Sequence, residues 1–408
     1  MPKQLSEFDK RAGQVKKSVL ANGGNVPTNA PEEGSGLLSA SAIRENILID
    51  FKQVVLQADS LRGGTKERRT IDYSLADIAK DRFGFGSADA LYMALGINPS
   101  SHTLDSLSSM SDFNEGFRWL QPEVIREAIR LGLRRNPIYP SLIASEETVD
   151  QKKVTLPHIN MSDATPEIIN EGETIQVGSV SFGEKDVKLH KIGTGLQISD
   201  EVQKYVSLNI LSMYLQDAGV KLGLGMDAMA VDVLINGDNG SSNFSAPVIG
   251  TENGSSIAYK DLLRAWLRMG RIGRTPSGLL SAEDAALEIL LLDEFKGWSP
   301  NSNQTHKTLN IKTPIPQSQD YLLHGAMPSG PKLMLIDNKA ALIKLNATSL
   351  QVESERIAQR QMSGTYATVT TGYAKLFRDA CLILDGTQSF AGFPTFMDVS
   401  AAENVIIK

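Results

Sequence analysis

The chain has 408 residues, of which 41% are hydrophobic and 22% charged, and its formal net charge is −6 at pH 7. This composition is typical of a globular protein, with room for about two or three ordinary domains or one elongated one, and it excludes a chain that is disordered or fibrous throughout. The acidic balance disfavours a protein whose main task is to coat nucleic acid, and the single cysteine, Cys381, excludes an intrachain disulfide framework.

The first segment, residues 1–40, mixes alternating charges with a stretch rich in glycine, proline and asparagine, which is typical of an arm. After Ser41, a candidate N-cap, apolar residues at helical spacing predict a helix that ends at Gly63. Two shorter helical patterns follow in residues 72–83 and 87–96. We therefore expect residues 1–110 to form an arm and small helices on loose joints.

The next segment, residues 121–137, predicts a helix with Pro122 in its first turn. A basic stripe runs along it, made of Arg126, Arg130, Arg134 and Arg135. The stripe is either a solvated helix face paired with Glu123 and Glu127, or a surface that contacts phosphates without sequence preference. Residues 138–159 contain prolines and β-branched residues without a helical period, which predicts an extended strap leading into a strand.

A polar β-ribbon is predicted in residues 169–199. Ile175 and Val177 alternate with polar residues in one limb, Gly183 permits a turn, and Val187 and Leu189 alternate in the other limb. Few residues on either face are apolar, and a two-stranded ribbon is marginally stable alone in water. We therefore expect the ribbon to lie across another surface.

One unusually long helix follows the ribbon. Its pattern persists through residues 208–235, which would span roughly 40 Å at 1.5 Å per residue. Gly219, Gly223 and Gly225 lie inside it, and each costs up to ~1 kcal/mol relative to alanine. We therefore expect either close packing against another backbone or a bend.

A separate α/β module is expected beyond Gly237. Residues 258–272 and 282–298 have amphipathic helical patterns, residues 333–337 predict a short buried strand, and residues 338–346 predict a helix. Residues 349–357 and 375–386 alternate as strands.

No motif for catalysis or metal binding is evident. The five histidines form no HxxxH or HxH pair, and the GDNG sequence at residues 237–240 lacks the ligand spacing of a calcium loop. Ser329 and Ser363 lie in neither a GxSxG nor an SxxK motif. The sequence has neither the apolar core of a signal peptide nor a run of roughly 18 apolar residues. We expect a soluble, cytoplasmic, non-enzymatic protein without metal, cofactor or membrane partner.

An ordered set of short motifs runs through the middle of the chain: Glu171-Gly172-Glu173, Ser181-Phe182, Lys188, Lys191, Ile198-Ser199-Asp200-Glu201 and Asn236-Gly237-Asp238. With the arginine-rich helix before them and the long helix among them, these motifs resemble the major capsid proteins of tailed bacteriophages, which share the Hong Kong 97-like fold. No single one of these motifs is specific to that family, whereas the set of motifs in this order is. The resemblance continues more weakly through LMLIDNKAALIKL and AKLFRDACLILD, so that it covers residues 121–386.

The resemblance implies an α+β, Hong Kong 97-like capsid fold with an N-terminal arm and helical extension, an extended β-hairpin loop, a peripheral domain with a long spine helix, and an α/β axial domain. The implied segments are residues 1–110 for the N-terminal extension, a candidate scaffold, 111–153 for the helix and strap, and 154–198 for the extended loop. Residues 199–236 would be the spine helix, 237–346 the axial domain, and 347–408 the return to the peripheral sheet and the C-terminal tail.

The implied function is a shell subunit that self-assembles as pentamers and hexamers into an icosahedral head enclosing double-stranded DNA. It would be assembled in the host bacterial cytoplasm and reside in the virion. Its partners would be copies of itself, packaged DNA bound non-specifically, and portal and scaffolding or decoration proteins. Ribbon residues expected to contact a neighbouring subunit are Ile175, Val177, Lys185, Val187, Lys188 and Leu189, and Arg126, Arg130, Arg134 and Arg135 would face DNA.

Two further properties occur in only some proteins of this family, covalent crosslinking and removal of an N-terminal segment, and the sequence does not decide either of them. Some crosslink a loop lysine to an asparagine of a neighbour; Lys185 and Lys188 are candidates by position only. Some lose an N-terminal scaffolding segment to a protease, and a sequence that begins at Met1 is compatible with retention or with an unprocessed form.

Two other functions are compatible with the sequence. One is an encapsulin-type compartment shell of the same fold, although such shells tend to be shorter and lack a helical extension. The other is a hydrolase that uses the α/β module, which would be a compact monomer or small oligomer.

Overall fold

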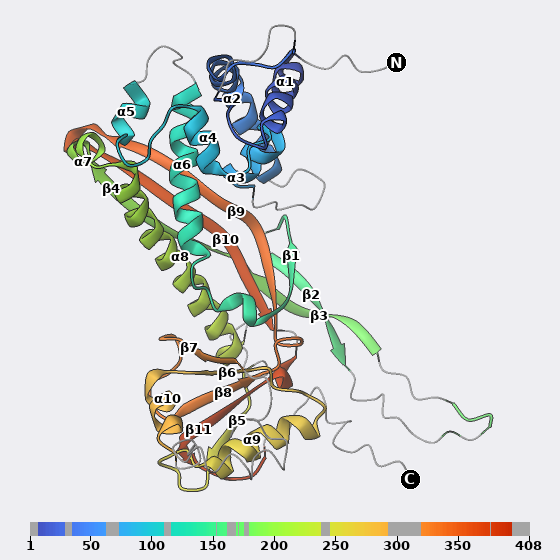
Figure 1. Ribbon diagram of the computed structural model, residues 1–408. Coiled ribbons are helices and arrows are strands. Elements are labelled where there is room, and N and C mark those ends of the chain that lie inside the picture. Colours follow the sequence, from blue (N-terminus) through green and yellow to red (C-terminus); the bar gives the residue numbers. More distant parts are fainter. Residues whose placement is uncertain are drawn as a thin grey trace, which may run out of the picture. The chain divides into compact units, whose positions relative to one another are not determined.

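The computed structural model describes residues 7–28, 35–62, 73–109, 116–151, 153–160, 169, 171–174, 179–237, 245–292, 320–375 and 377–393 (Figure 1). The chain forms two compact units, each built from separated stretches. Unit 1 comprises Met1–Pro137, Lys191–Gly223 and Thr348–Thr370, and unit 2 comprises Ile138–His190, Leu224–Ala347 and Thr371–Lys408. Among the described helices, none is both long and apolar enough to cross a lipid bilayer.

The N-terminal region of unit 1 is helical. Its helices are α1 Glu7–Ala21, α2 Ala40–Arg62, α3 Leu75–Ile78 with a π-helical turn at Ala79–Phe83, α4 Ala88–Ala94 and α5 Leu104–Ser109. The Ser74 and Asp77 side chains form a capping box that starts α3, and the Ser87 hydroxyl caps α4. The prediction of an arm is wrong for residues 7–21, because α1 buries Val15 and Val19.

Helix α6, Gly116–Leu133, packs with these helices around one apolar core. It begins before the predicted helix, so Pro122 lies inside it and not in its first turn. The core joins Val19 and Phe51 from the first two helices to Leu120 and Ile129 of α6 and Leu215 of a later helix. The expected loose joints are therefore wrong, since the N-terminal helices share a single core.

A four-stranded sheet has the order β1-β9-β10-β4, with β1 at Ile143–Thr148, β9 at Leu342–Ile357, β10 at Met362–Lys375 and β4 at His190–Ser199. Strand β1 runs parallel to β9. The helix predicted for residues 338–346 is wrong, because the chain enters β9 at Leu342 and pairs there with β1. Pairing with a neighbouring strand outweighs the helical propensity of this short segment.

Helices α7, Asp200–Tyr205, and α8, Leu208–Asn236, follow β4. The Ser199 hydroxyl caps α7 by accepting the Val202 N–H. The long helix is confirmed and begins at the predicted Leu208.

In unit 2 a five-stranded sheet has the order β5-β11-β8-β6-β7. Its strands are β5 Val248–Thr251, β11 Cys381–Ser389, β8 Lys332–Ile336, β6 Gly278–Ser281 and β7 Asp320–Leu323. Helices α9, Tyr259–Arg271, and α10, Glu283–Leu290, pack on one face of this sheet around Leu333, Leu335 and Leu384. Strand β11 was expected to return to the peripheral sheet with β9 and β10, and it instead completes this sheet.

The remaining strands, β2 Lys153–Asn160 and β3 Ser179–Lys188, form an antiparallel ribbon whose strands lie side by side (Figure 1). Short 3-10 turns occur at Tyr139–Ser141, Ala358–Arg360 and Arg378–Ala380.

Candidate intersubunit surfaces

The β2–β3 ribbon is a sheet of its own, since within the described residues its strands pair only with each other. The pairing differs from the prediction: the partner of β3 is the strap at Lys153–Asn160, and Gly183 lies inside β3 and not at a turn. The register shifts between Leu156 and His158. Pro157 lies at that point and has no N–H to donate, which explains the interrupted ladder.

The apolar residues at the base of the ribbon belong to their own chain. Val187 and Leu189 are 1% and 2% exposed and pack with Leu345 and Ala374. The expectation that these two side chains contact a neighbour is therefore corrected, because they anchor the ribbon to unit 2. Lys188 between them is exposed.

Three other predicted contact residues cannot be placed on a surface. Ile175, Val177 and the side chain of Lys185 lie outside the part of the chain that the structure describes.

Helices α6 and α8 approach so closely that their backbones touch. A methyl group added at Gly219 would overlap the carbonyl oxygen of Ile129, and one at Gly132 would overlap that of Gln216. A methyl group added at Gly223 would lie 3.5 Å from the carbonyl oxygen of Leu133, which is an ordinary contact distance. Close packing, one of the two explanations expected for the glycines of α8, is confirmed.

The arginine stripe of α6 is used mostly inside unit 1. Arg126 pairs with the buried Glu123, and its Nη1 lies 3.4 Å from Asp59 Oδ1. Arg130 is 7% exposed and its Nη1 lies 3.5 Å from Glu127 Oε2. These two residues therefore do not present a free surface for DNA, and the paired-face alternative holds for them.

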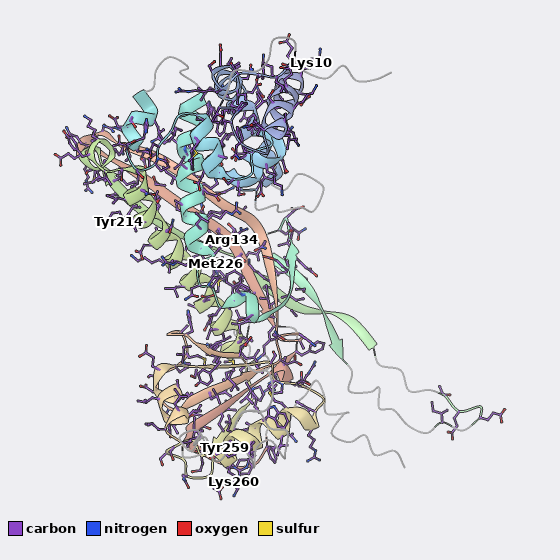
Figure 2. All side chains as sticks on the ribbon, in the orientation of Figure 1. Lys10, Arg134, Tyr214, Met226, Tyr259 and Lys260 are labelled. Carbon is purple, nitrogen blue, oxygen red and sulfur yellow. The ribbon has the colours of Figure 1, made fainter. Side chains whose placement is uncertain are left out.

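The last two arginines of the stripe, Arg134 and Arg135, are exposed (Figure 2 labels Arg134). Burial alone would raise the pKa of Asp77, but hydrogen bonds from Ser74 and the charges of Arg130 and Arg134 hold that pKa below its usual value. Arg134 thus contributes to the electrostatics of its own unit while its side chain faces solvent.

Apolar side chains are exposed along α7 and the first half of α8. Tyr205 is 82% exposed, and Ile210, Met213 and Tyr214 follow at helical spacing on one side of α8 (Figure 2 labels Tyr214). Leu211 and Leu215 on the opposite side are buried. An exposed apolar stripe of this kind is typical of an interaction surface.

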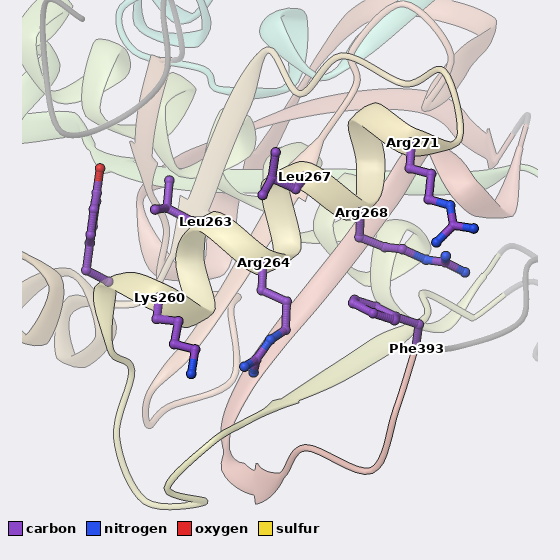
Figure 3. A pocket seen from close by; sticks show the side chains of 8 residues that line it. Lys260, Leu263, Arg264, Leu267, Arg268, Arg271 and Phe393 are labelled. Atoms are coloured by element: carbon purple, nitrogen blue, oxygen red, sulfur yellow. The ribbon is translucent and has the colours of Figure 1, made fainter. Parts of the chain in front are cut away.

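The outer side of α9 combines cations with apolar side chains around a hollow of about 610 Å³. Figure 3 shows Lys260, Arg264 and Arg268 on one side of the helix, with Arg268 beside Phe393, and Leu263 and Leu267 pointing the other way. The Arg268 guanidinium lies 4.9 Å from the centre of the Phe393 ring. Leu267 is 60% exposed.

Two carboxylates hold part of this face in place, Glu252 directly after β5 and Asp261 in the first turn of α9. Glu252 Oε2 lies 2.8 Å from Lys260 Nζ and 3.5 Å from Arg264 Nη2. Asp261 Oδ1 lies 2.9 Å from Arg264 Nη1. Arg268 is buried beside Phe393, and Arg271 at the end of the helix is exposed.

The outer side of α10 has the opposite charge. Its exposed charged residues are Glu283 and Asp284, and the helix contains no basic residue. Asp284 accepts the Gly330 N–H at 3.2 Å, and the third acidic residue, Glu288, is half-buried and accepts the Ile257 N–H at 2.8 Å. Leu287 and Leu290 are 61% and 64% exposed, and Leu291 directly after the helix is also exposed. This face thus has an apolar centre with an acidic rim.

Neither the α9 face nor the α10 face was predicted from the sequence. A signal was available in each case. Leu267 in α9 and Leu287 in α10 fall outside the buried faces formed by Leu262, Ala265 and Met269 in the first helix and by Ala285 and Ile289 in the second. An apolar residue outside the core stripe of an amphipathic helix indicates a second contact surface.

One buried carboxylate, Asp227 of α8, has a structural role. Its Oδ1 accepts the N–H groups of Ile138 and Tyr139, at 3.1 and 2.8 Å, and so binds the start of the strap. Burial raises the pKa of Asp227, and the two hydrogen bonds and the nearby His324 partly oppose that rise. His324 Nε2 lies 4.0 Å from Asp227 Oδ2. Among the described residues, no group of three His, Cys, Asp or Glu side chains could hold a metal ion.

No family model matches the sequence, and the search of curated proteins returned no match. Among solved structures, the chain is similar to a virus-like particle from Pyrococcus furiosus, with a TM-score of 0.43, 11% identity, and coverage of 64% of this chain and 98% of that one. It is similar to the capsid of the cyanophage P-SCSP1u, with a TM-score of 0.43, 13% identity, and coverage of 63% and 90%.

A third similar structure is the holo-SrpI encapsulin complex from Synechococcus elongatus, with a TM-score of 0.44, 12% identity, and coverage of 64% and 91%. With TM-scores below 0.5, these likenesses add nothing to what the chain's own residues support.

Proposed function

We propose that the protein is a structural subunit that assembles with identical copies into a closed shell, and specifically that it is the major capsid protein of a tailed bacteriophage. The observation that carries the proposal is the β2–β3 ribbon, whose strands pair only with each other among the described residues. The base of the ribbon packs on its own chain through Val187 and Leu189, whereas its two strands leave open edges, which favours a partner that covers them.

The exposed apolar surfaces support self-assembly. Apolar side chains are exposed on α8, α9 and α10, in both units of the chain. A subunit that remained solitary would have several separate apolar surfaces in contact with water, whereas a shell subunit covers such surfaces with its neighbours. Repetition of each contact around a closed shell lets modest interfaces sum to a stable particle.

The finer functional claims rest on the ordered motifs between Glu171 and Asp238. On that basis the subunits form the pentamers and hexamers of an icosahedral head that is assembled in the bacterial cytoplasm and encloses double-stranded DNA. Arg134 and Arg135 are the exposed members of the arginine stripe and remain candidates for non-specific phosphate contacts. Portal and scaffolding or decoration proteins are further expected partners.

An encapsulin-type shell is the second candidate, since it would use the same surfaces. The N-terminal helices favour the phage shell, because encapsulins tend to lack such an extension. The content of the particle distinguishes the two: a phage head contains DNA, and a compartment contains a protein cargo.

The test is gel filtration followed by electron microscopy of the purified protein. We expect a species in the void volume and closed particles of uniform diameter. A monomer or small oligomer that persists at high protein concentration would contradict the proposal and would favour the hydrolase alternative. Nuclease-protected DNA in particles from infected or induced cells would identify the phage function.

A further inference from the structure

We infer that the outer side of α9 is a docking surface for a segment of the same chain, residues 394–398, and that Phe396 of this segment binds Arg271. The segment lies outside the part of the chain that the structure describes. The contact belongs to a single subunit, so the inference does not depend on the proposed assembly. Two contacts of the same kind between described residues carry it.

The chain that leaves β11 already follows α9. The Arg264 guanidinium lies 4.3 Å from the centre of the Phe390 ring, and the Arg268 guanidinium lies 4.9 Å from the centre of the Phe393 ring. The two rings meet edge to face, with their centres 5.4 Å apart. Successive phenylalanines of the chain therefore pair with arginines on successive turns of the helix.

The order of these contacts gives the direction of the chain. Phe390 lies at Arg264 and Phe393 lies at Arg268, so the chain runs toward the C-terminal end of α9. The next basic residue is Arg271, in the last turn of the helix. The three arginines are spaced i, i+4 and i+7, which places them on one line of the helix surface. Figure 3 shows the side chains of Arg268 and Arg271 extending toward the same side of α9.

Arg271 is available for a third contact of this kind. It is exposed and lines the hollow of about 610 Å³ together with Phe393. It has neither an ion pair nor a ring contact with any residue in the described part of the chain. Arg264, by contrast, is held by Glu252 and Asp261.

The sequence after Phe393 suits this position. Residues 393–396 read Phe-Pro-Thr-Phe, so Phe396 follows Phe393 at the three-residue spacing that separates Phe393 from Phe390. Proline favours an extended backbone for itself and for the residue before it, and three extended residues span about 10 Å. The rise of the helix from Arg268 to Arg271 is about 4.5 Å, which lies within that reach.

Charge and tethering both favour this segment over a separate molecule. The one charged residue among residues 394–398 is Asp398, whose sign is opposite to that of Arg271. A ring tethered three residues from Phe393 acts at an effective concentration on the order of millimolar, which compensates for the weakness of one exposed cation–π contact. A neighbour in an assembled particle would then meet residues 394–398 and not the bare helix.

Modification of arginines by phenylglyoxal tests the contact in full-length, unassembled subunits. The rate at each arginine is measured by mass spectrometry of peptides. We expect Phe396→Ala to raise the rate at Arg271 about two- to fivefold, since the free energy of an exposed cation–π contact corresponds to that factor. Arg135, which is also exposed, is the reference arginine, and its rate should stay unchanged.

Two matched variants accompany this measurement. Thr395→Ala changes the same segment without removing a ring and should leave the rate at Arg271 at the wild-type value. Phe396→Tyr keeps a ring and should also keep the protection. An Arg271 that reacts at the same rate in wild type and in Phe396→Ala would overturn the inference.

Dilution distinguishes the segment from a second copy. Protection by residues 394–398 should be the same at low and at high subunit concentration, because the contact is intramolecular. Protection that disappears on dilution would show that a second copy covers Arg271, and this result would also overturn the inference. The measurement requires no particles, so a negative result would leave the proposed shell function standing.

Discussion

Gly219 and Gly132 determine how closely α6 and α8 approach in unit 1. An added Cβ at Gly219 would overlap the Ile129 carbonyl oxygen, which is a backbone atom and cannot rotate away. We predict that Gly219→Ala destabilises the subunit by about 1–3 kcal/mol, or more if the helices cannot separate. The measurement is the midpoint of urea unfolding, followed by circular dichroism.

Gly13 of α1 is the matched control for this substitution. It is exposed, and nothing lies within 4 Å of an added Cβ. Gly13→Ala should therefore leave stability unchanged or raise it by up to ~1 kcal/mol, through helix propensity alone. Equal effects of the two substitutions would show that backbone contact does not limit the packing of α6 and α8.

Asp227 shows how a buried charge lowers stability at neutral pH. Because its folded pKa is raised above the usual 3.8, the folded state prefers the protonated carboxyl, and stability falls as the pH rises through the interval above 3.8. Asp227→Asn keeps an oxygen for the N–H groups of Ile138 and Tyr139 and removes the charge. We predict a higher unfolding temperature than wild type at pH 7, with an advantage that shrinks as the pH approaches 3.8.

The control at this position is Asp227→Ala. It leaves the N–H groups of Ile138 and Tyr139 without their acceptor and should cost about 1–3 kcal/mol at every pH. An Asn variant that unfolds below the wild-type temperature at pH 7 would show that the carboxylate charge stabilises the fold.

At the scale of elements, the ribbon depends on its anchor in unit 2. Val187 and Leu189 are buried with Leu345 and Ala374, so serine at either position would place a hydroxyl in an apolar cluster and leave a cavity. We predict that Val187→Ser/Leu189→Ser destabilises the chain by about 2–4 kcal/mol. Thermal unfolding of unassembled subunits measures this effect.

Lys188, which lies between the two anchors and is exposed, is the control residue. Lys188→Ser should leave unfolding unchanged. If the double serine variant unfolds at the wild-type temperature but fails to assemble, the two side chains serve a neighbour after all.

Elements with a strong, uninterrupted pattern could be predicted from the sequence. Helix α8 begins at the predicted Leu208, α9 is confirmed at Tyr259–Arg271, and the strand at residues 333–337 is present as β8. The segment at residues 338–346 was predicted incorrectly, because its strand pairs with β1, which lies about two hundred residues away in sequence. The partner of β3 was missed for the same reason, since local alternation does not specify register.

The candidate surfaces were less predictable than the elements. A sequence pattern identifies apolar residues but does not show which chain buries them, so Val187 and Leu189 were assigned to a neighbour. The role of the arginine stripe could not be decided from the sequence. Glu123 and Glu127 lie at helical spacing from the arginines, but only the burial of these side chains in the structure shows that Arg126 and Arg130 are used in pairs inside unit 1. The exposed faces of α9 and α10 could be recognised only once the structure showed which side of each helix packs on the sheet.

At the scale of the whole molecule, the N-terminal helices are part of the subunit's core. Val15 and Val19 of α1 belong to the same apolar cluster as Ile129 of α6 and Leu215 of α8. We predict that deletion of residues 1–28 exposes this cluster and makes most of the protein insoluble. The soluble fraction after centrifugation is the measurement.

Lys17→Asp tests the opposite side of the same helix. Lys17 is exposed, so this variant should remain as soluble as wild type. A deletion variant that stays soluble and folded would indicate a dispensable segment, as expected of a scaffold that is removed.

The discontinuous make-up of unit 1 has a consequence for biosynthesis. Its core cluster extends from Val15 to Val369, so a nascent polypeptide cannot complete that core until most of the chain has left the ribosome. At about 5–20 residues per second, translation separates the first helix from the last strand of this core by tens of seconds. If the protein assembles as proposed, each molecule would become competent for assembly only at the end of its own synthesis, and unfinished chains would stay out of growing shells.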